Sequence, residues 1–343
     1  MDLRTLGNSG TVVSSLALGT MTFGAEADEA TSHTLIDTYL EAGGTFLDTA
    51  DVYSSGTSET IIGSWLAAHP GRRDDIVIAT KGRFPMGQGS NDLGLSRTHL
   101  RKALDSSLAR LGVDHIDLYQ MHAWDARTPI EETLRFLDDA VTAGKISYYG
   151  FSNYLGWQLT KAAATARLHG WAPPVTLQPQ YNLLVRGIEH EVVPAALDQG
   201  IGLLPWSPLA GGWLSGKYRR DQSPTGATRL GENPTRGMEA WEKRNADPRT
   251  WKVIDTVTRI AAEESASPSQ VALAWLLAQP AVTSVILGAR TTEQLEDNLG
   301  AGDLRLEPHH LAALTLASAP VVEDYPYGEP GRQQRHRKLE GGR

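Results

Sequence analysis

The sequence predicts a (β/α)8 TIM barrel, an α/β fold in which a ring of parallel strands lies inside a ring of helices. Three observations predict it. Short segments rich in Val, Ile and Leu alternate with longer segments of helical periodicity, this alternation occurs eight times, and the short segments are almost continuously apolar. Continuous apolar strands are typical of a parallel sheet that is covered on both faces. The length of 343 residues also suits one such barrel.

A β-hairpin is expected before the barrel. Leu3–Leu6 and Thr11–Val13 flank GNSG (7–10), a segment of residues that favour turns. The eight barrel strands follow in chain order. They are expected at SLALG (15–19), TFLD (45–48), IVIATK (76–81), HIDLYQMH (115–122), ISYYGFS (146–152), VTLQPQY (175–181), IGLLPW (201–206) and SVILG (284–288).

Segments of helical periodicity lie between and after these strands. Some of them follow residues that favour the start of a helix: Ser267 precedes Pro268, and TPIE (128–131) resembles an N-cap with proline at the first position. The expected helices cover residues 29–42, 58–68, 96–111, 130–143, 157–169, 190–199, 250–264, 268–278 and 292–299.

Residues 207–250 interrupt this alternation. They are rich in Gly, Pro, Arg and Asn and lack a clear period, so we interpret them as a long loop after strand seven at the mouth of the barrel. Residues 1–330 are therefore expected to form a single (β/α)8 domain. Residues 331–343 are polar and basic, and we expect them to form a disordered tail.

The overall composition restricts the classes of function. The net charge is −8, whereas nucleic-acid binding usually leaves a basic surface. The chain has no cysteine, which excludes disulfides and cysteine-based catalysis. We see no secretory signal in MDLRTLGNSG and no apolar run long enough to span a bilayer. These features predict a cytoplasmic protein without a nucleic-acid or membrane partner, either a monomer or a homo-oligomer.

Side chains able to take part in catalysis occur where the expected strands end. Asp48 ends the second strand, Tyr53 follows in its loop, Lys81 ends the third strand and His122 the fourth. Because the active site of a (β/α)8 barrel lies at the carboxyl ends of its strands, we expect these four side chains to share one rim.

These four residue types form a plausible proton-donating site. A phenol has a pKa of roughly 10 in water, and a nearby ammonium such as that of Lys81 lowers the pKa of Tyr53. Asp48 can neutralise a buried Lys81, and His122 can donate a hydrogen bond to a substrate oxygen. The arrangement suits protonation of a carbonyl oxygen during hydride addition.

Seven motifs on successive strands resemble those of a known family. They are FLDTADVYSSGTSE (46–59), IATKG (78–82), LYQMH (118–122), YGFSNY (149–154), LQPQYNLL (177–184), PWSPLAGGWLSGKY (205–218) and LGARTTEQLEDN (287–298). In this order, from about residue 2 to residue 320, they resemble the aldo-keto reductase superfamily, including its branch related to potassium-channel β subunits. The resemblance implies a catalytic tetrad of Asp48, Tyr53, Lys81 and His122.

The resemblance also implies that NADPH or NADP+ lies extended across the barrel mouth, without a Rossmann domain. Trp206, at a position where many relatives carry Tyr, would stack on the nicotinamide. Arg290 would bind the 2′-phosphate, which favours NADPH over NADH because a guanidinium pairs well with phosphate. The residues implied to contact the cofactor are Gly19, Thr20, Ser152, Asn153, Gln178, Trp206, Ser207, Leu209, Gly211, Lys217, Gly288, Arg290, Gln294 and Asn298.

The implied substrate is a small carbonyl compound, which is reduced to an alcohol with Tyr53 as general acid. Phe23, Phe84, Trp124 and Trp213 are candidate walls of the substrate pocket. Two alternatives stay open. One is a slow-turnover NADP(H)-binding regulatory or interaction subunit, and the other is a biosynthetic reductase of keto-sugars or polyketide ketones.

Two further patterns do not predict a site. GGWLSGK (211–217) fits part of a phosphate-binding P-loop, but Tyr218 follows where Ser or Thr is needed, and the surrounding residues are those of a long loop. Asp48 and His122 are residue types found in metal-dependent barrels, but the first strand has no His-x-His pair. We therefore expect no metal.

Overall fold

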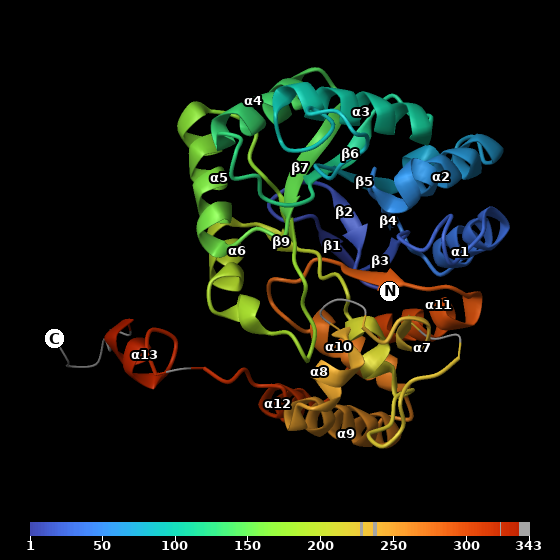
Figure 1. Cartoon of the computed structure of the whole chain (residues 1–343), viewed down its shortest axis with the longest axis vertical. Helices are drawn as coiled ribbons and strands as arrows, with labels where there is room; N and C mark the ends of the chain where they lie inside the picture. Colours follow the sequence, from blue (N-terminus) through green and yellow to red (C-terminus); the bar gives the residue numbers. More distant parts are fainter. Residues whose placement is uncertain (227–228, 236–238, 323, 336–343) are drawn as a thin grey trace.

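In the computed structural model, parallel strands form the centre of the molecule and helices surround them, as the sequence predicts (Figure 1). The structure describes residues 1–226, 229–235, 239–322 and 324–335. Eight parallel strands pair in the order β10-β3-β4-β5-β6-β7-β8-β9. Their bounds are β3 Leu16–Gly19, β4 Phe46–Asp48, β5 Val77–Gly82, β6 Ile116–Met121, β7 Ile146–Ser152, β8 Thr176–Gln178, β9 Gly202–Leu203 and β10 Val285–Gly288.

Backbone hydrogen bonds between β9 and the β10 segment close this sheet into a barrel. Leu203 N donates to Ala281 O at 2.8 Å, and Thr283 N donates to Leu203 O at 2.9 Å. Farther along, Ile286 N donates to Pro205 O at 3.0 Å. The first and last strands of the sheet are thereby joined, which is the closure that a (β/α)8 barrel requires.

The N-terminal hairpin closes the bottom of the barrel. Its strands β1 (Leu3–Thr5) and β2 (Val12–Ser14) pair antiparallel, so the expected hairpin is confirmed. Gly7 in the turn has a φ of 56°, and a Cβ there would lie 2.0 Å from Val175 O, so the close approach requires glycine. The hairpin and the inward-facing strand positions form one buried cluster, consisting of Leu6, Val13, Ala17, Phe46, Ala79, Leu118, Val175, Leu204 and Ile286.

A larger apolar cluster lies between the strands and the outer helices. Alternate strand residues such as Leu18, Leu47 and Ile78 point into it, because successive side chains of a strand face opposite sides. The nine helices expected from periodicity are all present. They are α1 Glu29–Glu41, α2 Thr57–Ala68, α3 Arg97–Leu111, α4 Ile130–Thr142, α5 Gly156–His169, α6 Val192–Gln199, α9 Pro248–Glu263, α10 Pro268–Leu277 and α11 Thr292–Leu299.

The two helix-start signals have different outcomes. Ser267 caps α10 as expected: its hydroxyl accepts from Gln270 N at 3.1 Å, and the Gln270 side chain accepts from Ser267 N at 3.1 Å. Thr128 does not cap α4. Its hydroxyl donates instead to Asp125 Oδ2 at 2.7 Å, and Pro129 is the N-cap residue of that helix.

The expected long segment does follow the seventh barrel strand, β9, but parts of it are helical. It contains the turns η4 (Ala210–Ser215), α7 (Arg229–Glu232) and α8 (Trp241–Asn245), and α9 begins at Pro248. These pieces are too short to show helical periodicity in the sequence, and tertiary packing stabilises them. The segment lies beside α9 and α10 in the lower part of the molecule (Figure 1).

Two C-terminal helices were not expected. Helix α12 (Pro308–Ala317) buries Leu314 but leaves Leu316 76% exposed; it carries apolar residues on several sides, so it lacks a clear amphipathic stripe. Helix α13 (Glu329–Arg335) covers the start of the expected disordered tail, and residues 336–343 lie outside the described residues. None of the helices described is long and apolar enough to cross a membrane.

Candidate active site

Lys81 lies at the centre of the expected tetrad. Neighbouring strands carry Lys81 on β5 and Asp48 at the end of β4, and both side chains are buried. Lys81 Nζ donates to Asp48 Oδ2 at 2.6 Å, to Thr49 O at 2.8 Å and to the Tyr53 hydroxyl at 3.3 Å. An ammonium group has three N–H donors, so each of them has a partner. Burial disfavours the charged lysine, but Asp48 and Tyr53 raise the pKa of Lys81 above its usual value.

Tyr53 opens the short helix η1 (Tyr53–Gly56) directly after β4. Ser54 and Ser55 have φ values of 48° and 55°, which turn the chain sharply behind the tyrosine. The ring centroid of Tyr53 lies 4.9 Å from Lys81 Nζ. Burial raises the pKa of Tyr53 more strongly than Lys81 lowers it, so the net direction is upward. Lys81 lowers this pKa as expected, but burial outweighs it, so Tyr53 is protonated at physiological pH.

His122 follows β6 and completes the rim. Its ring centroid lies 5.9 Å from that of Tyr53 and 4.7 Å from that of Phe84. Burial, together with the cations Lys81 and Arg83, lowers the pKa of His122 to about 2. The imidazole is thus neutral at physiological pH, and its buried Nδ1 has no hydrogen-bond partner among the described residues.

Two amides hold the other oxygen of Asp48. Gln178 Nε2 donates to Asp48 Oδ1 at 2.8 Å, and Gln120 Nε2 donates to it at 3.3 Å. Gln178 was expected to contact a cofactor, and it also positions Asp48 here. Gln120 was not expected; it precedes His122 by two residues, which places both on the same face of β6.

Four of the residues expected to contact the cofactor form one network. Ser152 Oγ donates to Gln178 O at 2.9 Å, and Asn153 Nδ2 donates to His122 O at 3.0 Å. Trp206 Nε1 donates to Asn153 Oδ1 at 3.0 Å. Asn153 has a φ of 59°, a conformation that Asn tolerates better than most residues. The structure therefore brings four of the expected cofactor residues beside the tetrad.

Two other expected cofactor residues, Gly19 and Thr20, lie where β3 ends. A Cβ on Gly19 would lie 2.6 Å from the Ile286 side chain. The buried Thr20 hydroxyl contacts Ser58 Oγ at 2.8 Å and Asp48 O at 3.1 Å. In this structure the Thr20 hydroxyl therefore serves to hold the strand ends together.

The other residues expected to contact the cofactor lie on the segment after β9 and near α11. Ser207 and Gly211 have φ values of 53° and 65°, and Leu209 precedes η4. Lys217 Nζ lies 5.3 Å from the ring centroid of Tyr218. Gly211 and Gly212 both have positive φ values, and Gly212 N donates to Leu209 O at 2.9 Å.

Arg290 already has two carboxylate partners. Glu232 of α7 lies 3.1 Å from it and Glu26 lies 3.4 Å from it. The Gln294 side chain accepts from Arg290 N at 3.0 Å. Asn298 of α11 is buried, whereas Gly288 is exposed. Any phosphate bound at Arg290 must therefore compete with Glu232 and Glu26.

The four aromatic residues expected at the substrate pocket separate into two pairs. Phe84 and Trp124 are half-buried near the rim, on the loops after β5 and β6. Phe23 and Trp213 are fully buried. Trp213 stacks on Trp241 at 4.9 Å under the long segment. Packing thus removes Phe23 and Trp213 from the surface of the mouth.

A buried acidic pair lies behind the tetrad and was not expected. Glu59 Oε2 accepts from Arg110 Nε at 2.7 Å, and its Oε1 accepts from the Thr80 hydroxyl at 2.5 Å. Asp51 is fully buried, and neither of its carboxylate oxygens has a hydrogen-bond partner among the described residues. Burial, followed by the charge of Glu59, raises the pKa of Asp51 to about 7.

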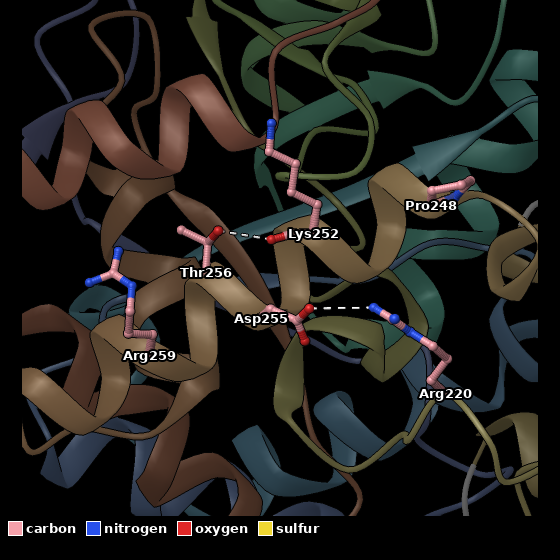
Figure 2. A pocket seen from close by; sticks show the side chains of 6 residues that line it. All are labelled: Arg220, Pro248, Lys252, Asp255, Thr256 and Arg259. Atoms are coloured by element: carbon pink, nitrogen blue, oxygen red, sulfur yellow. Dashed lines mark hydrogen bonds and ion pairs between the residues drawn. The ribbon is translucent and has the colours of Figure 1, made fainter.

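A separate hollow of about 370 Å³ lies on the outer face of α9. Figure 2 shows its lining, in which Asp255 pairs with Arg220 at 3.4 Å and the Thr256 hydroxyl donates to Lys252 O at 2.8 Å. Its lining residues include none of the tetrad. In the described parts of the chain, no group of three or more His, Cys, Asp or Glu side chains is arranged to hold a metal ion. Buried ionisable groups converge at the barrel mouth, which is the better candidate active site.

Comparisons with known proteins identify the family of this chain. The sequence model of the Aldo/keto reductase family matches residues 15–318, which include the whole tetrad. The chain is 40% identical over 322 residues to the uncharacterized oxidoreductase YrpG of Bacillus subtilis (strain 168), covering 92% of this chain and 95% of that protein. It is 35% identical over 339 residues to a probable voltage-gated potassium channel subunit beta of Oryza sativa subsp. japonica, covering 98% and 100%. It is 33% identical over 343 residues to versiconal hemiacetal acetate reductase of Aspergillus parasiticus, covering 93% and 98%.

Proposed function

Because the chain belongs to the aldo/keto reductase family, we propose that it reduces aldehydes or ketones to alcohols with NADPH and that Tyr53 donates the proton. The observation that carries this proposal is the contact of the buried Lys81 ammonium with both Asp48 and the Tyr53 hydroxyl. A lysine held in this way stabilises the tyrosinate that remains after proton donation.

The proposed residue roles follow from the protonation states of the site. The raised pKa of Tyr53 keeps the phenol protonated before reaction. The lowered pKa of His122 keeps its imidazole neutral, so it acts as a hydrogen-bond donor and does not compete as an acid. Both groups are placed to bind the carbonyl oxygen, and the hydrogen bonds of Gln178 and Gln120 to Asp48 hold the Lys81 counter-ion in position.

The donors present suit NADPH. Arg290 offers a guanidinium, and Trp206 is a half-buried aromatic next to Asn153. When bound, NADPH supplies the hydride. The carbonyl carbon gains that hydride, the C=O π electrons pass to the oxygen, and Tyr53 transfers its proton to that oxygen to complete the alcohol.

The decisive test is Tyr53→Phe. We expect kcat to fall by about 10²- to 10⁴-fold, the usual contribution of a general acid, while NADPH still binds. Turnover is measured from loss of NADPH absorbance with an aldehyde panel, and cofactor binding is measured by fluorescence titration. Tyr325→Phe, at a tyrosine that is 68% exposed, is the matched control. Full activity in Tyr53→Phe would contradict the assignment.

A second candidate function has its own support. The Oryza sativa relative, named a probable potassium channel subunit beta, matches 98% of this chain, so a slow-turnover NADP(H)-binding subunit is the alternative proposal. The steady-state rate on aldehydes, ketones, quinones and keto-sugars separates the two. The Aspergillus parasiticus relative is named as a reductase, which supports including complex carbonyl substrates in this panel, as a biosynthetic role requires.

A further inference from the structure

We propose that Arg83 binds an anionic group of the substrate, and that the preferred substrates are carbonyl compounds bearing a carboxylate on an apolar or aromatic body. This inference rests on the proposed function, because it assumes that the carbonyl group lies between Tyr53 and His122. It adds a residue that determines which carbonyl compounds are accepted.

The backbone places Arg83 on the rim. It directly follows β5, two residues after Lys81, and its φ of 152° lies in a region that non-glycine residues rarely adopt. Gly94 N donates to Arg83 O at 2.8 Å, which anchors this conformation. Strained backbone of this kind is found mostly at functional sites.

The guanidinium lies beside the reacting groups. Its central carbon is 5.0 Å from the ring centroid of Phe84, and that ring is 4.7 Å from His122. Arg83 is near enough to His122 to help keep its imidazole neutral. A substrate whose carbonyl oxygen meets His122 would therefore extend past Phe84 towards the guanidinium.

Arg83 forms no close ion pair within the described parts of the chain, although it is near enough to Asp125 to help lower the pKa of that carboxyl group. Its Nη2 donates to Trp124 O at 3.4 Å, a long hydrogen bond to an uncharged group, and its buried Nε has no partner. Across the described residues no ion pair involves Arg83. The partly buried Arg4 and Arg249 likewise have none and donate to backbone carbonyls, whereas three other shielded arginines have carboxylates at 2.7–2.8 Å. These pairs are Arg73–Asp117, Arg110–Glu59 and Arg186–Glu189.

The carboxylate nearest in sequence to Trp124, that of Asp125, already accepts hydrogen bonds from other groups. Asp125 Oδ2 accepts from Leu95 N at 3.0 Å and from the Thr128 hydroxyl at 2.7 Å, and its Oδ1 accepts from Arg127 N at 3.0 Å. Asp125 therefore supports the loop structure and does not pair with Arg83. A guanidinium with free donors suits a carboxylate, which it can bind through two parallel hydrogen bonds.

The surroundings of Arg83 are aromatic. Trp124 packs edge-to-face on Tyr154 at 5.2 Å and on Trp157 at 5.5 Å. Trp157 is 55% exposed, and the adjacent Leu155 is 56% exposed. A cation beside exposed aromatic and aliphatic surface matches a ligand that has an apolar body and one negative charge.

The test uses two aldehydes that differ in one charge, 4-formylbenzoate and its methyl ester. The full-length enzyme with NADPH is assayed as wild type, Arg83→Met and Arg83→Lys. We expect Arg83→Met to lower the acid-to-ester ratio of kcat/KM by about 10- to 100-fold, mainly through KM for the acid, because a hydrogen bond to a charged group is lost. Arg83→Lys keeps the charge and should restore part of the ratio.

Arg127→Met is the matched control, since it removes an exposed positive charge from the same loop as Trp124. It should change the ratio by no more than about twofold because exposed charges are screened. An acid-to-ester ratio that is the same in wild type and Arg83→Met, with both proteins folded by circular dichroism, would overturn the inference. If Arg83→Met does not fold, Arg83→Lys decides: an unchanged ratio and unchanged KM for the acid would overturn it.

A binding measurement separates this inference from the proposed function. Calorimetric titration of 4-(hydroxymethyl)benzoate into the NADP+-loaded protein should give weaker binding in Arg83→Met than in wild type. If wild type reduces neither aldehyde but binds this acid through Arg83, the reductase proposal fails and the anion site stands. If wild type reduces the ester but binds no acid, the anion site is refuted and the reductase proposal stands.

Discussion

Replacing Asp51 by Asn is expected to stabilise the protein at alkaline pH and to change its stability little at acidic pH. Asp51 is fully buried, and neither carboxylate oxygen has a hydrogen-bond partner among the described residues. Glu59, also buried, lies close enough to repel a second negative charge, although Arg110 offsets part of this repulsion. Burial and Glu59 together raise the pKa of Asp51 to about 7 from the ordinary 3.8.

The size of the effect follows from the difference between these two pKa values. In the unfolded chain Asp51 loses its proton near pH 3.8, and in the folded protein near pH 7. Between these values only the unfolded state ionises, so the free energy of unfolding falls by about 1.4 kcal/mol per pH unit. Over this interval of about three units the loss is about 4 kcal/mol. This loss of stability is absent below both pKa values and complete above pH 7. The Asp51→Asn variant does not show it at any pH.

The assay is denaturant unfolding of wild type and Asp51→Asn from about pH 4 to about pH 9. The variant should gain up to about 4 kcal/mol relative to wild type as the pH rises, and should differ by about 1 kcal/mol or less at the acid end. Asp74→Asn, at an exposed aspartate, should show a flat difference. A stability difference that does not grow with pH, or that grows in the opposite direction, would refute this account of Asp51.

Three further variants test the tetrad and the expected phosphate contact of Arg290. Lys81→Met should lower kcat by at least about 10²-fold and destabilise the protein by about 3–5 kcal/mol, because Asp48 is left buried and unpaired. Adding Asp48→Asn should restore stability but not activity, and denaturant unfolding that shows no recovery would contradict the ion-pair explanation. Glu232→Gln should tighten NADPH binding by about two- to fivefold, because one exposed competitor for Arg290 is lost. In fluorescence titration the affinity for NADH should change less in Glu232→Gln than the affinity for NADPH. An equal change for both cofactors would show that Glu232 does not act through the site of the 2′-phosphate.

Periodicity was enough to predict most of this fold, and the strand ends indicated which polar side chains lie together on its rim. In a parallel barrel every strand points the same way, so residues that end successive strands must meet on one rim. Asp48, Lys81 and His122 therefore come together whatever the details of packing. Tyr53 was predicted through the same rule, since it lies five residues after Asp48 in the loop that begins at that rim.

Short elements and the C-terminal region were predicted less well. Helix α12 lacks an amphipathic stripe, and the turns α7 and α8 are too short for periodicity to reveal. Their conformations depend on contacts with distant parts of the chain, such as the stacking of Trp241 on Trp213. No local pattern indicates such contacts.

The amino-acid sequence by itself predicted the barrel and the hairpin, because backbone periodicity and turn-forming residues are local properties. The proposed tetrad came from the strand ends together with the resemblance to a known family. Only the tertiary structure decided the pKa of Tyr53 and the ion-pair partners of the arginines at the rim. Burial outweighs Lys81 in setting the pKa of Tyr53, Glu232 and Glu26 pair with Arg290, and Arg83 has no ion pair among the described residues. These properties depend on the distances and exposure of groups far apart in the sequence, and such quantities exist only after the chain has folded.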